Sequence, residues 1–303
     1  MKFGLYSSIA NPPRGEHLDR CIDEVIAEAQ LAEANGFDSC FFGEHHQDAD
    51  GFLPSPLIVA RAVAARTTRL RVGTSVILLP LHHPVHVAED VITLDLVSKG
   101  RVTLGVGIGY QPADFRAFNV PMEHRMTIFE ESIEILRRCW AGEPFSYHGK
   151  HYTLDNVQIR PRPFQPSGPP LWIGASVPAA ARRAGRVADG FVGTPSTSLE
   201  NATRLAEIYT HAAREAGRQP EVIQMRDAWV APTRAEAEQV YGPHVMTAYR
   251  YYWENRLAEF RNLSADAQFT LEPAYGFGRW TQYTCQNWTS NSASSFTNTY
   301  VAK

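Results

Sequence analysis

Residues 71–106 read RVGTSVILLPLHHPVHVAEDVITLDLVSKGRVTLGV, and this stretch decides the fold. It begins with an apolar, β-branched run over Arg71–Leu79, which is typical of a buried strand. A helix is expected over Pro84–Val97, because proline suits the first helical turn. Ser98-Lys99-Gly100-Arg101 then makes the turn into a second strand over Val102–Val106. Strand, helix and strand in this order indicate a βαβ unit of a parallel sheet.

The same alternation extends in both directions from this unit. The further expected strands are Lys2–Tyr6, Ser39–Phe42, Leu171–Gly174, Gly190–Val192 and Val222–Ala231. The further expected helices are His17–Ala34, Pro56–Ala65, Phe129–Trp140, Pro178–Val187, Leu199–Ala216 and a last one that starts over Arg234–Tyr241 and continues over Met246–Phe260. The chain has 303 residues, and α/β barrels commonly occupy about 250 residues as one domain. The pattern therefore predicts an α/β fold of the (β/α)8 TIM-barrel type.

One internal segment interrupts the alternation. Gly142–Pro170 is rich in proline, tyrosine and histidine, and its two β-like runs, His151–Leu154 and Val157–Arg160, flank Asp155-Asn156. We interpret this segment as an insertion hairpin over one mouth of the barrel.

The C-terminal end also departs from the pattern. No leucine or isoleucine follows Leu271, and no acidic residue follows Glu272. An eighth strand and helix are therefore not expected, and we divide the chain into a barrel domain over residues 1–272 and an atypical polar tail over residues 273–303. Two interpretations of the tail stay open: a disordered polar segment, or a C-terminal βα unit that has been replaced or shifted out of frame.

Composition narrows the class of protein. The net charge is −3 and 44% of the residues are hydrophobic, so nothing favours nucleic-acid binding. No apolar run of about 20 residues predicts a membrane span, and the N-terminus lacks a signal peptide's features. The four cysteines are far apart and form no CxxC motif. We expect free thiols and a cytoplasmic location.

Residues that could carry chemistry follow the expected strands, because barrel active sites lie at the carboxyl ends of the strands. Four segments stand at these places: Gly43-Glu44-His45-His46, Leu79-Pro80-Leu81-His82-His83-Pro84, Gly105-Val106-Gly107-Ile108-Gly109-Tyr110 and Gly174-Ala175-Ser176.

The Glu44-His45-His46 cluster allows three interpretations. Histidine and glutamate are metal ligands, but adjacent residues of an extended chain point in opposite directions. No third and fourth ligand follows at a suitable spacing, so no metal site is expected. A histidine hydrogen-bonded at a strand end is a structural alternative. The remaining one is an acid–base histidine with Glu44 as its neighbour, because imidazole titrates near neutral pH.

The glycine-containing segments differ in how strongly they indicate a binding site. Gly105, Gly107 and Gly109 loosely match a dinucleotide fingerprint, but the third glycine comes too soon. A strand end that needs close backbone approach explains them equally well. The segment Gly174-Ala175-Ser176 precedes an expected helix, where small residues leave backbone N–H groups free to face an anion.

Together these motifs resemble the bacterial luciferase-like flavin-dependent monooxygenases. The resemblance covers about residues 1–271, and its order and spacing make it specific although each motif alone is weak. Its matching elements are Gly43–His46, Val72–Pro80, His83–Val85, Glu89-Asp90, Leu94-Asp95, Ser98–Arg101, Gly107–Tyr110, Asp114-Phe115, Trp172–Gly174 and Ala184–Phe191.

The resemblance implies a barrel with a flavin ring at the strand ends. By position, His45 matches the family's pocket histidine, which assists oxygen chemistry, and Glu44 matches its acidic neighbour. Thr74-Ser75-Val76 matches the third-strand segment under the ring, where we predict a non-prolyl cis peptide at Ser75–Val76. The other implied cofactor contacts are Gly107, Tyr110 and the phosphate-binding turn Gly174-Ala175-Ser176.

One departure concerns the cofactor phosphate. Luciferase has a basic residue near the fourth strand, but the corresponding position here is Ile108. The phosphate partner is therefore expected elsewhere, at Arg125 or at backbone amides.

By resemblance, the expected activity is that of a two-component monooxygenase. A separate flavin reductase would supply reduced FMN, and O2 would be used on a small apolar organic substrate. Homodimers are common in the family. Two alternatives stay open: a deazaflavin-dependent oxidoreductase that transfers hydride, and a flavin-binding barrel without catalysis.

Overall fold

The computed structural model describes residues 2–7, 18–47, 53–254 and 299–302. The chain divides into two compact units. The N-terminal unit comprises residues 4–174 together with 188–190. The C-terminal unit takes in the described parts of 1–3, 175–187 and 191–303.

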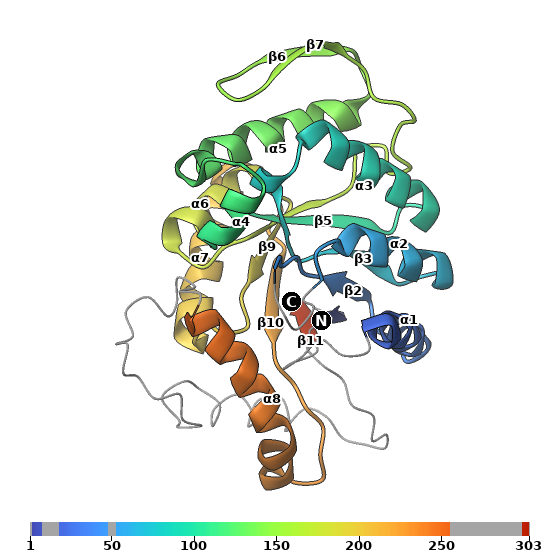
Figure 1. Ribbon diagram of the computed structural model, residues 1–303, viewed down its shortest axis with the longest axis vertical. Helices are drawn as coiled ribbons and strands as arrows, with labels where there is room; N and C mark the ends of the chain where they lie inside the picture. The colour runs from blue at the N-terminus through green and yellow to red at the C-terminus, as the bar shows by residue number, and fades with distance from the viewer. Residues whose placement is uncertain (1, 8–17, 48–52, 255–298, 303) are drawn as a thin grey trace. The chain divides into compact units, whose positions relative to one another are not determined.

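Strands and helices alternate along the N-terminal unit (Figure 1). Its strands are β1 (Lys2–Ser7), β2 (Ser39–Phe42), β3 (Arg71–Thr74), β4 (Ile77–Leu78), β5 (Val102–Gly107), β6 (Phe145–His148), β7 (Thr153–Val157) and β8 (Leu171–Gly174). Its helices are α1 (Leu18–Ala34), α2 (Pro56–Arg66), α3 (Pro84–Ser98), α4 (Pro112–Ala117) and α5 (Arg125–Ala141), with short 3-10 turns at Leu79–Leu81 and Met122–His124.

Five strands of this unit pair in parallel in the spatial order β1-β2-β3-β5-β8. Leu5 stands opposite Cys40, and Gly105 stands opposite Trp172. Every residue of β5 is buried, as expected for a parallel strand that is covered on both faces. The βαβ unit predicted from residues 71–106 is therefore present.

The Arg101 side chain stabilises the turn that ends α3. Lys99 adopts a left-handed conformation (φ 56°), and its amide donates to the Asp95 and Leu96 carbonyls. The Arg101 guanidinium then donates to the carbonyls of Ala64, Leu70 and Ser98, among others. One side chain thus joins the end of α2, the start of β3 and the turn into β5.

The strand expected over Arg71–Leu79 is interrupted. The Ser75–Val76 peptide bond is cis, as predicted, and it separates β3 from β4. β4 still pairs with β5, with Ile77 opposite Val106. Leu79 belongs to the 3-10 turn that follows and not to the strand.

The insertion hairpin is present, but its strands lie elsewhere than expected. β6 and β7 pair antiparallel and the chain reverses at residues 149–152, so Asp155-Asn156 lies inside the second strand. The Glu131 carboxylate of α5 accepts hydrogen bonds from the amides of Lys150 (2.8 Å) and His151 (3.0 Å). These bonds hold the hairpin turn on α5, beyond which the hairpin projects (Figure 1).

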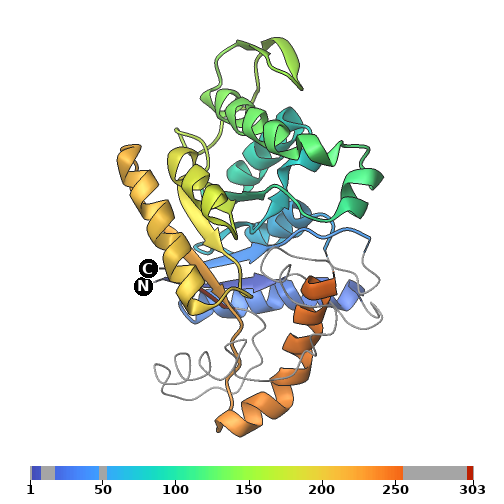
Figure 2. The ribbon, with the colours of Figure 1, turned by 90° about the vertical axis from the view of Figure 1, so that its left-hand side faces the viewer.

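The C-terminal unit contains α6 (Pro178–Val187), β9 (Gly190–Gly193), α7 (Leu199–Glu215), β10 (Val222–Arg226), α8 (Arg234–Glu254) and β11 (Thr299–Ala302). α6 and α7 lie side by side (Figure 2). A Cβ at Gly185 would lie 2.6 Å from the Tyr209 carbonyl oxygen, so only glycine allows this approach. β9 and β10 are parallel, with Phe191 opposite Val222.

The structure corrects two expectations for this part of the chain and confirms a third. The strand that begins at Val222 ends at Arg226 instead of Ala231. α8 runs continuously through Pro243, as expected for a helix that starts at Arg234 and continues past Met246, while residues 255–260 lie outside the described residues. A strand, β11, does form near the C-terminus, because Thr299–Ala302 pairs with β10 through backbone groups that any side chain allows. It runs antiparallel, so it is not the strand of a βα unit.

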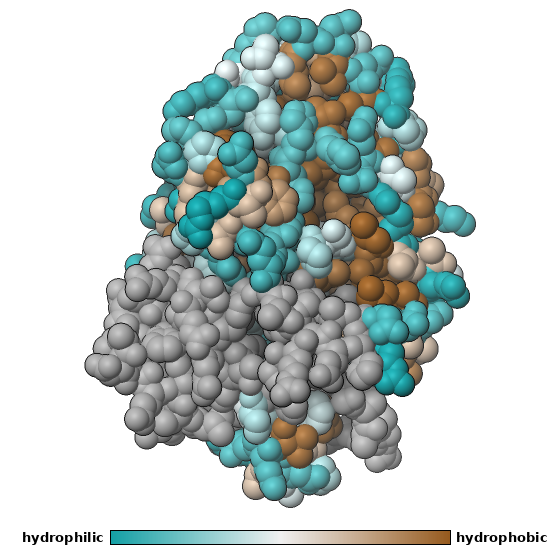
Figure 3. Space-filling view, viewed as in Figure 1, coloured by the Kyte–Doolittle hydropathy of each residue, from teal (hydrophilic) through white to brown (hydrophobic). Residues whose placement is uncertain are grey.

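Exposed apolar side chains occur on several helices of the N-terminal unit, α2 and α3 among them. Hydrophobic atoms gather over α2 and α3 (Figure 3). Ile58 on α2 is 65% exposed, and Leu96 and Val97 on α3 are each 40% exposed. Within the described residues, no helix combines the length and apolar character needed to cross a membrane.

Candidate active site

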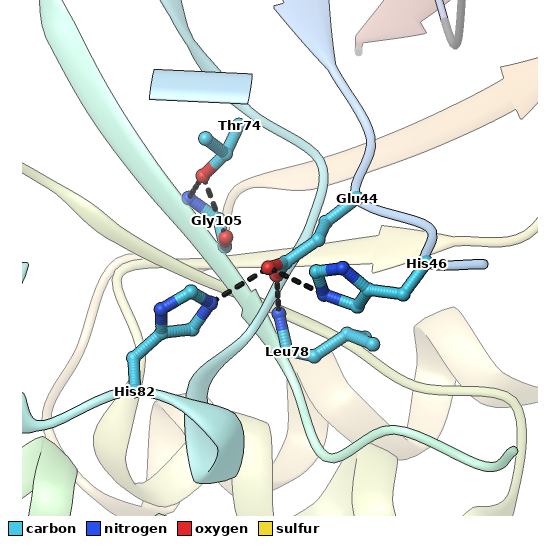
Figure 4. Close-up of polar contacts among 6 residues, drawn as sticks. All are labelled: Glu44, His46, Thr74, Leu78, His82 and Gly105. Carbon is cyan, nitrogen blue, oxygen red and sulfur yellow. Dashed lines mark hydrogen bonds and ion pairs between the residues drawn. The ribbon is translucent and has the colours of Figure 1, made fainter. Parts of the chain in front are cut away.

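A buried carboxylate lies directly after β2. Oε1 of Glu44 accepts hydrogen bonds from Nε2 of His46 (3.0 Å) and Nε2 of His82 (2.7 Å), as Figure 4 shows. Its Oε2 accepts a hydrogen bond from the backbone amide of Leu78. A carboxylate accepts and does not donate, so both imidazoles present an Nε2–H to it. Glu44, His46 and His82 are called the carboxylate cluster below.

The contacts within the carboxylate cluster shift the pKa values of Glu44 and His82 in opposite directions. Burial alone would raise the pKa of Glu44, but hydrogen bonds from His46, His82 and the Leu78 amide lower it to about 2. Burial alone would lower the pKa of His82, but the hydrogen bond and negative charge of Glu44 raise it above its ordinary value. Glu44 is therefore ionised at neutral pH, and His82 favours the imidazolium form more than an isolated histidine does.

His45 does not share the carboxylate of Glu44, whose oxygens accept from His46, His82 and the Leu78 amide. Its own amide donates to the Leu53 carbonyl (3.1 Å), and its side chain is largely enclosed. Burial lowers the pKa of His45 to about 4, with the negative charge of Glu44 opposing this effect and His46 adding to it. His45 is thus a neutral imidazole at pH 7.

The segment Thr74-Ser75-Val76 joins three strand ends. The Thr74 hydroxyl donates to the Gly105 carbonyl (2.7 Å) and accepts from the Gly105 amide (3.1 Å). The Ser75 amide donates to the Phe42 carbonyl (2.7 Å), and the Glu44 amide donates to the Val76 carbonyl (3.1 Å). The structure therefore brings this segment against the chain that carries Glu44.

The glycines expected near a cofactor have a packing role around Val76. A Cβ at Gly107 would lie 2.7 Å from Cγ2 of Val76, and one at Gly174 would lie 3.1 Å from Cγ1. The Val76 side chain therefore lies between the ends of β5 and β8. Tyr110, which follows β5, is partly exposed.

The proposed phosphate-binding turn is only partly available. The Ala175 amide donates to the Val192 carbonyl (3.2 Å), and the phosphate-binding role of the turn stays a prediction. Ser176 is partly exposed just before α6. Arg125 begins α5, and its guanidinium donates to the Met122 carbonyl (2.9 Å).

Sequence reasoning missed several members of this site. Asp114 on α4 is buried, which raises its pKa above the ordinary value despite the opposing charge of His46. The Phe118 ring lies 4.6 Å from the His46 ring and 6.5 Å from the His82 ring. In the sequence, His82 is one of two adjacent histidines, and Glu44 and His46 are two residues apart. Neither signal indicated that they share one oxygen.

No metal-binding arrangement is found in the described part of the chain, where no group of three or more His, Cys, Asp or Glu side chains is placed to hold an ion. Cys21, Cys40 and Cys139 are free thiols.

The alternating parallel strands, with polar side chains at the strand ends, define a TIM-barrel protein with a site at the carboxyl ends of its strands. The family model described as luciferase-like monooxygenase matches residues 1–281. The chain therefore belongs to the luciferase-like monooxygenase family, and the family and fold expected from the motifs are confirmed.

Two curated relatives and one solved structure are similar to the chain. The 4-hydroxyprotoasukamycin monooxygenase of Streptomyces nodosus subsp. asukaensis is 31% identical over 76% of this chain and 63% of its own length. The F420-dependent glucose-6-phosphate dehydrogenase of Nakamurella multipartita is 38% identical over 56% of this chain and 52% of its own length. The crystal structure of monooxygenase RslO1 from Streptomyces bottropensis superposes with a TM-score of 0.77 at 30% identity, covering 82% of this chain and 78% of that one.

The chain thus spans between half and two thirds of the length of these two curated relatives. Both relatives are oxidoreductases by name, and they represent the oxygen-using and the F420-using members of one fold.

Proposed function

We propose that the chain is an oxidoreductase that uses a flavin-type cofactor, acting as the oxygenating part of a two-component monooxygenase. It would receive reduced FMN from a separate flavin reductase and use O2 to oxidise a small apolar organic molecule. The observation that carries this proposal is the buried, ionised carboxylate cluster beside the neutral His45 at the end of β2.

The residues at the strand ends fit a planar aromatic cofactor. Val76 presents a branched apolar side chain flanked by Gly107 and Gly174, positions where a Cβ would push it away. Its carbonyl is fixed by the Glu44 amide. An apolar surface next to a group of fixed polar donors is typical of sites for small organic cofactors. Thr74, Ser75, Val76, Gly107, Tyr110, Gly174, Ala175 and Ser176 stay the predicted cofactor contacts.

When bound, reduced flavin supplies the electrons that O2 chemistry needs. The residues of the chain itself move protons and hold the site in place. His45, as a neutral imidazole, can take a proton at one ring nitrogen or give one from the other. Glu44 holds His46 and His82 at fixed positions and keeps a constant negative charge at pH 7. The Phe118 ring lies beside both imidazoles, nearer to that of His46.

A His45→Ala variant tests this assignment. If His45 manages the proton, the variant should still bind reduced FMN, yet it should release more hydrogen peroxide per O2 consumed than the wild type. The measurement is oxygen uptake with parallel peroxide detection under single-turnover conditions. His86→Ala is a suitable control, because the His86 side chain is 79% exposed. An unchanged ratio of peroxide to oxygen would remove His45 from the mechanism.

The deazaflavin alternative also has support, because the F420-dependent relative is 38% identical to this chain. In that case the cofactor would transfer hydride and O2 would have no part. Reduced F420 should then bind in the anaerobic protein and pass its electrons to a substrate, with no increase in oxygen uptake over the free cofactor. The reductase partner and the homodimer stay predictions under either alternative.

A further inference from the structure

Two histidines from different parts of the chain share one carboxylate oxygen. His46 lies two residues after Glu44, whereas His82 follows the 3-10 turn after β4. Both Nε2 atoms are within 3.0 Å of Oε1 of Glu44, and the second oxygen is engaged by the Leu78 amide. Glu44 is thus surrounded by donors, which suits a permanent anion and does not suit a group that exchanges protons with a ligand.

The two histidines differ in their access to water. The His46 side chain is 8% exposed and that of Glu44 is 0% exposed, but the His82 side chain is 32% exposed. His82 is therefore the member of the carboxylate cluster that can equilibrate its proton with solvent. When His82 takes up a proton at Nδ1, its Nε2–H still donates to Glu44, because both nitrogens of an imidazolium are donors.

The charged groups around the cluster are few among the described residues. Asp90 on α3 adds a favourable charge effect at His82. Asp114 on α4 lies within reach of the charges of His46 and Glu44. Glu44 is in direct contact with His82, and its negative charge balances that of a protonated His82. A protonated His82 offsets the negative charge of Glu44, and a neutral His82 removes this offset.

We propose that His82 is a positioning residue for this site: it fixes the Glu44 carboxylate from the solvent side and makes the net charge of the carboxylate cluster follow solvent pH. A bound cofactor or substrate next to the cluster would then meet a less negative cluster at lower pH and a more negative one at higher pH. This consequence for a ligand rests on the proposed function, but the behaviour of the cluster itself does not.

The first test uses the protein without any cofactor. His82→Gln keeps a donor that can reach Glu44 but cannot carry a charge, and His86→Gln is a matched control on α3 whose partner Asp90 also influences His82. NMR titration of 15N-labelled histidine should show the His82 signal, identified by its loss in His82→Gln, titrating above the ordinary histidine range. In a Glu44→Gln variant the same signal should titrate lower. A His82 signal at its ordinary value that ignores Glu44→Gln would overturn the proposal.

Unfolding in urea gives a second measurement, which separates the effect of the His82 charge from the effect of the shape of its side chain. Because the pKa of folded His82 is raised, its protonation stabilises the fold at pH values below the ordinary histidine value and is lost as pH rises through the folded value. The unfolding equilibrium constant of His82→Gln should thus exceed that of the wild type by roughly tenfold at pH 5.5, and the ratio should shrink at pH 9. If the ratio of the two unfolding constants is the same at both pH values, the role of His82 is purely structural and the proposal is contradicted.

A third measurement separates this inference from the proposed function. The dissociation constant of reduced FMN should vary with pH in the wild type and in His86→Gln, and this variation should be weaker in His82→Gln. If neither reduced FMN nor reduced F420 binds the wild type while the NMR result holds, the proposed function fails and the inference stands. If the cofactor binds with the same pH dependence in His82→Gln as in the wild type, the inference fails and the proposed function stands.

Discussion

Replacing Glu44 by glutamine should remove most of the energy that the carboxylate cluster contributes to the N-terminal unit. The pKa of this carboxyl group falls from an ordinary value of 4.5 to about 2 on folding. At about 1.4 kcal/mol per pKa unit, this difference corresponds to roughly 3 kcal/mol at neutral pH. Removing one member of a buried ion pair typically costs about 3–5 kcal/mol, which agrees in size.

The pH dependence has a definite sign. Because the folded pKa is lowered, the stabilisation is fully present above pH 4.5 and is lost as pH falls toward 2. Urea unfolding followed by tryptophan fluorescence should give a difference of about 3 kcal/mol between wild type and Glu44→Gln at pH 6, and a clearly smaller one at pH 3.5. Glu123→Gln, at an exposed position, is the matched control. A difference under about 1 kcal/mol at pH 6, or one that is equal at both pH values, would refute this reasoning.

Two further substitutions test the packing that places the site. Thr74→Val removes the hydroxyl that bonds both backbone groups of Gly105, so it should cost about 1–3 kcal/mol in urea unfolding, with Thr74→Ser close to wild type; equal losses in both variants would contradict this role. Gly185→Ala places a Cβ against the Tyr209 carbonyl and the Ala213 amide (2.6 and 2.8 Å), so α6 and α7 must separate at a cost of about 1–3 kcal/mol. An unchanged midpoint in thermal unfolding would show that the helices do not pack so closely in solution.

Local patterns were sufficient to predict most of the fold. The β-branched run from Arg71, the helix from Pro84 and the turn before Arg101 occupy the positions that propensity and capping favour. The predictions failed where long-range pairing decides. Propensity placed the hairpin turn at Asp155-Asn156, whereas the contacts of Glu131 with residues 150–151 hold the turn earlier in the chain. β11 forms by pairing with β10, and its four residues are too short a run to indicate a strand from sequence alone.

The sequence predicts a site after β2, but it does not predict the hydrogen bonds among the side chains there. Glu44 and His45 were identified because they follow a strand, and the strand end is where barrels place their chemistry. That Glu44 contacts His82 and not His45 depends on how the chain folds back after β4, which no local pattern encodes. The amide of Ala175 is likewise used by the neighbouring Val192, a pairing that the small residues of the turn could not reveal.

An anaerobic titration of the purified protein with reduced FMN, followed by admission of O2, tests the central claim most directly. The proposal predicts saturable binding, and it predicts that the oxidised-flavin absorbance then returns more slowly than it does for free reduced FMN, because the site shields the bound cofactor from water. Saturable binding of reduced F420 with none of reduced FMN would select the hydride-transfer alternative. Absence of saturable binding for both cofactors would contradict the assignment of this chain as a flavin-type oxidoreductase.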